Sequence, residues 1–257
     1  MMVGVYSLEG EKVRELLLPP IFGVEPRSDL VRRAFLFEVS RRLQPKGVDP
    51  MAGKRTSAET WGKGFGVARV RRVKGSRYPA AGRGAFAPFT VGGRRAHPPK
   101  TEKKLVEKMN RKEYLSALKS AIASTAREKL VADRGHKFEV KELPVVVVGE
   151  LEGLKKTKEV REVFQKLGVL QDVERAKSGR KIRAGKGKRR GRKYRQPKGP
   201  LVVVAEDRGI GLASRNLPGV DVVRVEELSV EKLAPGGVPG RLTIWSEPAI
   251  RRLEEVL

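Results

Sequence analysis

The chain has 257 residues, a formal net charge of +26 and no cysteine. The lack of cysteine excludes a disulfide framework, a thiolate zinc site and a thiol nucleophile, and two histidines are too few for an all-histidine metal cage. The first residues contain neither a basic n-region nor a long apolar run, so we expect a cytoplasmic protein without a metal, a cofactor or a membrane partner.

The first 45 residues predict two strands and a helix. Residues 3–7 and Lys12–Leu17 are strand-like, and residues 29–43 follow a helical period. Ser28 is the expected N-cap of this helix, and Pro45 lies beyond its end.

Residues 46–97 follow no sustained helical or strand period. They contain twelve Lys or Arg against two acids, ten glycines and five of the chain's 14 aromatic residues. Because such a long irregular stretch is rare inside a compact domain, we interpret it as an extended loop that leaves the body. Nucleobases stack on aromatic rings and guanidinium planes, and the sequence shows no helix-turn-helix, zinc-finger or basic-zipper pattern, so the loop favours RNA over duplex DNA. The alternative is a flexible linker whose aromatic residues are there by chance.

Regular structure is expected again after this loop. Asn110 and Glu113 form a capping pattern for a helix that runs to about Val131. Residues 144–148 are an apolar, β-branched run typical of a buried strand, and residues 157–167 predict a further helix.

Residues 175–198 form a second basic stretch, with thirteen basic residues and no acid. With almost nothing apolar to bury, this segment should be disordered in the free protein and should act as a clamp on phosphate groups. A solvated run of charge and a localisation signal are the alternatives.

The C-terminal part predicts strands and helices in alternation. They are a strand at 201–205, a helix at 209–216, a strand at 220–225, the segments 229–233 and 241–245, and a helix at 247–257 capped by Ser246. This alternation predicts an α/β fold, a mostly parallel sheet with helices on both faces, in addition to the long extended basic loop.

We therefore expect three parts. Residues 1–45 and 98–257 form a discontinuous globular α/β body, 46–97 form the loop rich in Gly, Arg and aromatic residues, and 175–198 are a basic insertion in the body. The 181 residues outside the two basic stretches have a net charge of only +3 and suffice for one core. A nearly neutral body with two basic extensions indicates a polyanionic partner that binds the extensions.

One glycine-containing turn makes an enzyme an alternative interpretation of the chain. Residues 206–214 follow a strand and precede a helix, as a dinucleotide-binding turn does, but Ser214 replaces the third glycine and the acid pair Glu206 and Asp207 precedes the turn. An ordinary tight strand-to-helix connection is the simpler interpretation. The alternative function is a nucleotide- or cofactor-binding α/β enzyme that acts on RNA, and a third is a general condenser of nucleic acids.

A resemblance to a known family covers nearly the whole chain. Residues 49–62 (DPMAGKRTSAETWG), 67–70 (VARV) and 82–86 (GRGAF) resemble large-subunit ribosomal protein four in its archaeal and eukaryotic form. The similarity continues through 92–99 (GGRRAHPP), 110–113, 144–148, 188–194 and 199–205.

This resemblance implies a structural constituent of the large ribosomal subunit without catalytic activity. It implies a globular body on the particle surface and a loop that enters the rRNA and helps to form the nascent-peptide exit tunnel, opposite a second ribosomal protein. The implied partners are large-subunit rRNA, neighbouring ribosomal proteins and the nascent peptide. The loop tip would lie roughly within residues 69–78.

The expected RNA-binding residues are cationic or aromatic and lie in the two basic stretches. In the loop they are Lys54, Arg55, Trp61, Lys63, Phe65, Arg69, Arg71, Arg72, Lys74, Arg77, Tyr78, Arg83, Phe86, Arg94, Arg95 and His97. In the insertion they are Arg180, Lys181, Arg183, Lys186, Lys188, Arg189, Arg190, Arg192, Lys193 and Arg195. Neither His97 nor His136 has partners for a catalytic triad, so we expect both to be surface or RNA-facing and expect no catalytic residue.

Overall fold

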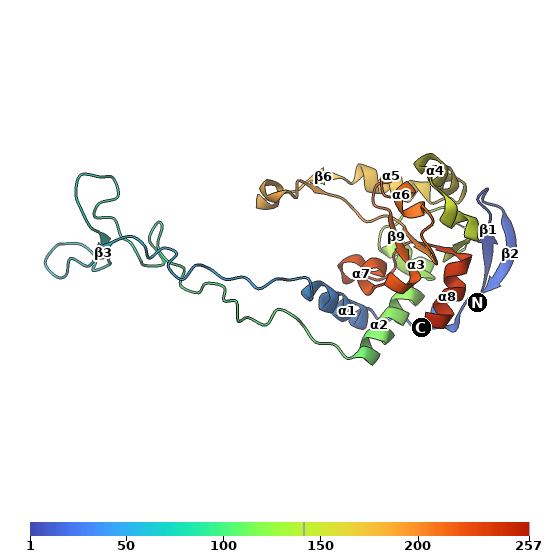
Figure 1. Cartoon of the computed structure of the whole chain (residues 1–257), viewed down its shortest axis with the longest axis horizontal. Helices are drawn as coiled ribbons and strands as arrows, with labels where there is room; N and C mark the ends of the chain where they lie inside the picture. Colours follow the sequence, from blue (N-terminus) through green and yellow to red (C-terminus); the bar gives the residue numbers. More distant parts are fainter. Residues whose placement is uncertain (141, 257) are drawn as a thin grey trace. The chain divides into compact units, whose positions relative to one another are not determined.

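A six-stranded sheet organises most of the chain in the computed structural model, which describes residues 1–140 and 142–256 (Figure 1). Its strands, in spatial order, are β2 (Lys12–Leu17), β1 (Met2–Tyr6), β5 (Val145–Val147), β10 (Thr243–Ser246), β8 (Leu201–Val204) and β9 (Asp221–Arg224). Only the pair β1 and β2 is antiparallel, and the other neighbours are parallel. The prediction of a mostly parallel sheet is therefore confirmed.

The strand register places apolar side chains on both faces of the sheet. Val5, Val146, Trp245, Val203 and Val223 are aligned in one row across five strands, and all five belong to one hydrophobic cluster. The residues one position away, such as Val145 and Ile244, belong to a second cluster, because successive side chains of a strand point to opposite faces. Strands buried on both faces explain the continuous apolar runs of the sequence.

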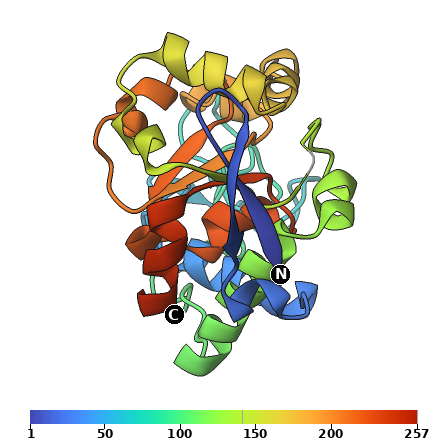
Figure 2. The ribbon, with the colours of Figure 1, turned by 90° about the vertical axis from the view of Figure 1, so that its right-hand side faces the viewer.

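Helices cover both faces, as the sequence predicted. The first cluster includes side chains of α1 (Ser28–Ser40), α2 (Arg111–Thr125), α7 (Val230–Leu233) and α8 (Glu247–Val256), and the second those of α3 (Glu128–Asp133), α4 (Thr157–Lys166), α5 (Leu170–Ser178) and α6 (Ile210–Ser214). Figure 2 shows α4 and α5, in yellow and orange, on the opposite side of the sheet from α1 and α2.

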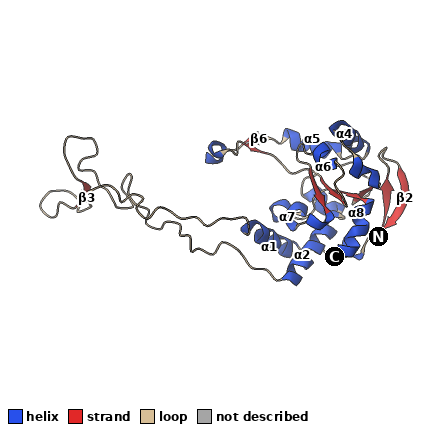
Figure 3. Ribbon diagram, viewed as in Figure 1, coloured by secondary structure: helices blue, strands red, loops and turns tan. Residues whose placement is uncertain are grey.

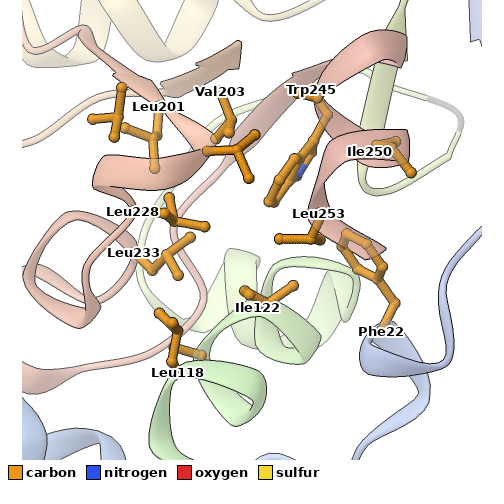
Figure 4. Close-up of a cluster of buried hydrophobic side chains, with 14 of the residues drawn as sticks. Phe22, Leu118, Ile122, Leu201, Val203, Leu228, Leu233, Trp245, Ile250 and Leu253 are labelled. Atoms are coloured by element: carbon orange, nitrogen blue, oxygen red, sulfur yellow. The ribbon is translucent and has the colours of Figure 1, made fainter. Parts of the chain in front are cut away.

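Trp245 lies at the centre of the first cluster. The side chain is fully buried, and its ring meets the ring of Phe22 edge to face, with centroids 5.5 Å apart. Leu253, Ile122 and Val203 surround it in Figure 4. The body therefore has a well-filled core on this face.

The chain divides into two compact units. The body comprises Met1–Arg41 and Glu107–Leu257, and the loop unit comprises Arg42–Val106. The Glu107 N–H donates to Ser40 Oγ at 3.1 Å, so the body is closed by a hydrogen bond across the point where the loop unit is inserted. Regular structure in the loop unit is limited to two short strands, β3 (Ala58–Glu59) and β4 (Arg72–Val73), and Figure 3 shows the rest as loop.

Two helix boundaries differ from the expected ones. Ser28 is the first residue of α1 rather than its N-cap, and the helix ends at Ser40. The expected helix from Asn110 to Val131 is two helices, because the chain is extended at Arg127. The hydroxyl groups just before this break bond back to backbone carbonyls of α2, and such bonds compete with the helical pattern.

The helix ends also test two capping predictions. Asn110 occupies the N-cap position of α2, but its side chain makes no capping hydrogen bond. The Ser246 cap is confirmed, because Ser246 Oγ accepts the N–H of Ala249 at 3.2 Å. The sequence did not predict α5, because its C-terminal residues were assigned to the basic stretch that follows it.

Candidate nucleic-acid interface

Glycines let the two limbs of the loop unit approach each other closely. A Cβ atom on Gly53 would lie 2.5 Å from the carbonyl carbon of Gly93, and one on Gly93 would lie 2.0 Å from the Ala87 oxygen. Gly53 also has a φ of +72°, which disfavours any other residue. The high glycine content at these positions therefore serves backbone packing within the loop.

Arg72 organises the head of the loop unit. Its strand β4 pairs with β3 on one side and bridges to Gly84 on the other. The guanidinium carbon lies 5.3 Å from the centre of the Trp61 ring, and Nη1 donates to the Gly82 oxygen at 2.9 Å. Trp61 in turn lies 6.0 Å from the Phe65 ring. Arg72 is half-buried, so its main role is to hold this head together.

The other predicted cations of the loop are at least partly exposed. Two of them form ion pairs: Lys74 with Glu59 at 2.6 Å and Arg55 with Asp49. The Tyr78 hydroxyl donates to the Lys74 oxygen. No ion pair is found within the described residues for Lys54, Lys63, Arg69, Arg71, Arg77, Arg83, Arg94, Arg95 or His97.

Aromatic and cationic side chains together line a hollow in the loop unit of about 440 Å³. Arg71 stacks on Phe86 with its guanidinium carbon 4.9 Å from the ring centre, and Arg94 and Phe89 lie on the same hollow. Phe89 is 79% exposed. Since an exposed ring beside guanidinium groups is the environment in which proteins stack unpaired bases, this hollow suits a nucleobase.

The second basic stretch forms a hairpin, which Figure 1 shows projecting from the body. Strands β6 (Lys181–Ile182) and β7 (Tyr194–Arg195) pair in antiparallel fashion over two residues each, and a 3-10 turn at Lys186–Arg190 forms the tip of the hairpin. The sequence predicted disorder for this stretch in the free protein, whereas the structure forms a hairpin. Two contacts hold it in addition to the strand pairing: Arg183 donates to the Arg192 oxygen at 3.2 Å, and Arg180 stacks 4.1 Å from the Tyr194 ring centre.

The hairpin presents its charge to solvent. No residue between 180 and 198 is buried, and none of the ten predicted cations from Arg180 to Arg195 forms an ion pair with any described residue. The charges of all ten are therefore not neutralised by carboxylates of the described residues.

Ion pairs and hydrogen bonds around the buried Arg241 anchor the base of the hairpin. Arg241 is fully buried and donates to the Gly199 oxygen at 2.9 Å and to Asp221 Oδ2 at 2.7 Å. Lys198 Nζ pairs with the same carboxylate at 2.9 Å. Burial alone would raise the pKa of Asp221, but the positive charges of Arg241 and Lys198 lower it. These contacts fix the returning strand of the hairpin to the sheet.

The sequence suggested a surface or RNA-facing role for His136, and the residue is buried, since only 7% of it is exposed. Its Nδ1 lies 2.9 Å from Asp172 Oδ2, and Asp172 Oδ1 accepts from Arg175 Nε at 2.7 Å. Burial outweighs the nearby carboxylate and lowers the pKa of His136. Burial alone would raise the pKa of Asp172, but the hydrogen bonds from His136 and Arg175 lower it. His136 is therefore neutral and Asp172 ionised at neutral pH.

These two pKa shifts predict that the body loses stability in acid. In both groups the folded-state pKa lies below the unfolded-state value, so the unfolded chain binds more protons as the pH falls. The His136 contribution is complete above its unfolded pKa of about 6.5 and is lost as the pH falls through the folded pKa, whereas the Asp172 contribution is lost below about pH 4. Urea unfolding between pH 7.5 and pH 5 should show a smaller pH dependence in His136→Asn than in the wild type.

Asparagine retains a donor for Asp172 at this position and removes the titration. His97→Asn is the matched control, because His97 is exposed, and its unfolding should follow the wild-type pH dependence. Equal slopes in all three proteins would contradict the assignment of the acid sensitivity to His136.

Carboxylates occupy the backbone N–H groups with which the turn at 206–214 would bind a nucleotide in the alternative enzyme. Asp207 Oδ1 accepts the N–H groups of Gly209 and Gly211, both at 3.0 Å, at the start of α6. The buried Glu152 accepts the two amides that follow β8, at 2.8 and 3.3 Å. A nucleotide phosphate needs such amides free, so the turn is a structural connection.

The part of the chain that the structure describes contains no helix long and apolar enough to cross a bilayer. Among the same residues, no three His, Asp or Glu side chains gather as metal ligands would.

Comparison with known proteins gives consistent matches along the chain. Residues 16–256 match the Ribosomal protein L4/L1 family. The large ribosomal subunit protein uL4 of Methanocaldococcus jannaschii is 56% identical over 255 residues, which cover 99% of both chains. The protein of the same name from Methanopyrus kandleri is 55% identical over 258 residues, with 100% of this chain and 99% of that one covered. The one from Methanosphaera stadtmanae is 52% identical and is covered to 96%.

Proposed function

Because the chain belongs to the ribosomal protein L4/L1 family, we propose that its loop unit and its basic hairpin are the parts that bind rRNA. The chain is a structural constituent of the large ribosomal subunit in the cytoplasm, and it has no catalytic role. Its contribution is to fold into rRNA and to offset the repulsion between phosphates during assembly.

One observation carries this proposal: the two extensions hold nearly all of the net charge, and most of their cations have no carboxylate partner among the described residues. Each Lys or Arg that neutralises a phosphate releases counterions. In the loop unit these cations are interleaved with exposed rings such as Trp61 and Phe65, which offer stacking surfaces to unpaired bases. Irregular RNA supplies both phosphates and splayed bases, whereas duplex DNA supplies phosphates alone.

The loop unit is also the part that we assign to the nascent-peptide exit tunnel. Its tip, residues 69–78, exposes Arg69, Arg71 and Arg77, and these side chains would face rRNA or the passing peptide. A neighbouring ribosomal protein would lie across the tunnel from this tip, and other large-subunit proteins would contact the body.

Replacing residues 46–97 by a short Gly-Ser link should abolish selective retention of large-subunit rRNA. The body should still fold, because Ser40 and Glu107 hold the two ends of the insertion together and neither hydrophobic cluster of the sheet depends on the loop unit. We would measure binding to large-subunit rRNA, unrelated RNA and duplex DNA of equal length across a salt titration. Far-UV circular dichroism and urea unfolding would confirm that the body is intact.

A charge-retaining variant separates shape from charge in this experiment. Substitution of Arg69, Arg71, Arg77 and Arg83 by Lys keeps every positive charge but removes planar stacking groups. This variant should keep the salt slope of the wild type and lose part of its preference for rRNA. If the full-length chain binds all three nucleic acids equally, with one steep salt slope, it is a cationic condenser and the proposal fails.

A further inference from the structure

A cationic hollow lies at the base of the hairpin, on the body. Its volume is about 530 Å³, and the side chains that line it include Arg134, His136, Arg175, Lys181, Arg195 and Lys198. Lys181 and Arg195 are opposite each other in the β6–β7 ladder, so their side chains lie on the same face of the hairpin. No Asp or Glu is among the lining residues.

The positive charge of this hollow is only partly compensated: Arg175 pairs with Asp172 and Lys198 with Asp221, whereas Arg134, Lys181 and Arg195 have no ion pair among the described residues. Arg134 Nη2 donates to the Pro235 oxygen at 2.6 Å and Nη1 to the Val238 oxygen, but Arg134 has no carboxylate partner among the described residues. Burial and the positive charges of Arg241 and Arg175 lower the pKa of Arg134 to about 10. A largely buried guanidinium without a counter-charge, such as that of Arg134, is unfavourable. An anion from outside the chain would remove this cost.

His136 adds a hydrogen-bond acceptor to the same hollow. Asp172 also accepts the Lys137 N–H at 3.1 Å and the Arg175 guanidinium, so Asp172 is a carboxylate and the His136 Nδ1 atom must donate to it. Nε2 of the neutral ring then carries a lone pair. It has no hydrogen-bond partner among the described residues, although the side chain is 2% exposed and lines the hollow. A ligand that fits must therefore bring a hydrogen-bond donor as well as an anion.

We propose that this hollow binds the sugar–phosphate backbone of RNA, with one phosphate among Arg134, Arg175, Lys181 and Arg195 and a ribose 2′-hydroxyl that donates to His136 Nε2. This inference rests on the proposed function, since it adds a backbone site on the body to the rRNA contacts of the extensions. A phosphodiester supplies the anion and the neighbouring ribose supplies the donor. DNA lacks the 2′-hydroxyl, so the same site discriminates RNA from DNA.

The two histidines of the chain make the site directly observable by NMR. We would label the imidazole nitrogens of the full-length chain and titrate it with hexauridylate, its 2′-deoxy counterpart and inorganic phosphate, at a pH near 7. The His136→Asn variant identifies the His136 signals. Hexauridylate should shift the Nε2 resonance of His136 in the direction of an accepted hydrogen bond. The deoxy oligomer and phosphate should produce a clearly smaller shift.

Affinity measurements on matched variants test the two halves of the site separately. His136→Asn should weaken hexauridylate binding about five-fold, as expected for one lost hydrogen bond, and leave binding of the deoxy oligomer unchanged. Lys181→Gln with Arg195→Gln should weaken both oligomers and remove the His136 shift. The control pair Lys188→Gln and Arg190→Gln removes the same charge from the exposed end of the hairpin, so it should leave the His136 shift intact.

Three outcomes would overturn this inference. They are an unchanged His136 resonance with every probe, equal shifts with the ribose and deoxyribose oligomers, and loss of the shift in the control pair. Each of these can occur while the full-length chain still retains large-subunit rRNA selectively, in which case the proposed function stands and only the hollow is wrong. If selective rRNA retention also fails, both are wrong.

Discussion

Replacing Arg241 by alanine should lower the free energy of unfolding of the body by about 4 kcal/mol, because it removes the buried partner of the Asp221 carboxylate, leaves that carboxylate with Lys198 alone, and takes the side-chain donor from backbone carbonyl groups around it. Arg241 is fully buried and bonds the Gly199 and Lys232 oxygens at 2.9 and 2.8 Å and Asp221 Oδ2 at 2.7 Å. Burial lowers the pKa of Arg241 despite the opposing effect of Asp221, but the group remains protonated at neutral pH.

Urea unfolding of the full-length chain, followed by circular dichroism, measures this loss. Arg215→Ala is the matched control, because Arg215 is exposed and its loss should change the free energy of unfolding by less than about 0.5 kcal/mol. The hairpin of the Arg241→Ala protein should also be cut faster by trypsin, since its returning strand is no longer anchored. A loss below about 1 kcal/mol would show that Arg241 does not anchor the hairpin.

Trp245→Ala should destabilise the body by a similar amount, about 4 kcal/mol, because it opens a cavity in the centre of the first hydrophobic cluster. The lost contacts include the edge-to-face pair with Phe22 and the neighbours from β5 and β8 in the same row of the sheet. The indole Nε1 also donates to Thr243 Oγ1 at 3.1 Å. Trp245→Phe keeps the ring contact and should cost less than half as much.

Trp61→Phe is the control for this experiment. Because Trp245→Ala removes the tryptophan of the body, urea unfolding of all these proteins is followed by circular dichroism. Trp61 is 43% exposed and lies in the loop unit, so its substitution should not change the unfolding of the body. If Trp245→Ala and the wild type unfold at the same urea concentration, Trp245 is not central to the core.

The sheet could be predicted largely from local patterns, but its strand order could not. Apolar β-branched runs such as 144–148 and 201–205 mark strands buried on both faces, and their alternation with helices implies parallel pairing. The last strand, β10, lies between β5 and β8, a placement that depends on packing between distant segments. The helix break at Arg127 was missed because the sequence keeps a helical period through this region. The period does not show that the Ser124 and Thr125 hydroxyl groups bond to backbone carbonyls just before the break.

The candidate nucleic-acid interface could also be predicted only in part. Charge density alone identified the basic stretches, and the hairpin exposes its ten cations as expected. Composition could not show that Arg72 is held by the Gly82 oxygen and the Trp61 ring. The sequence also contained no sign of Arg134, and it could not show that Arg134 and His136 lie together at the base of the hairpin, because only the fold brings them there.

Because a hydrogen bond joins Ser40 and Glu107, the stability of the body should depend little on the length of the loop unit inserted between them. The ends of the insertion are already adjacent, and doubling a flexible insertion adds only about 0.6 kcal/mol of closure entropy. Insertions and deletions within 42–106 are therefore tolerable to the fold of the body. Since neither hydrophobic cluster includes a residue of 42–106, the sheet of the body can form whether or not the inserted segment has met RNA.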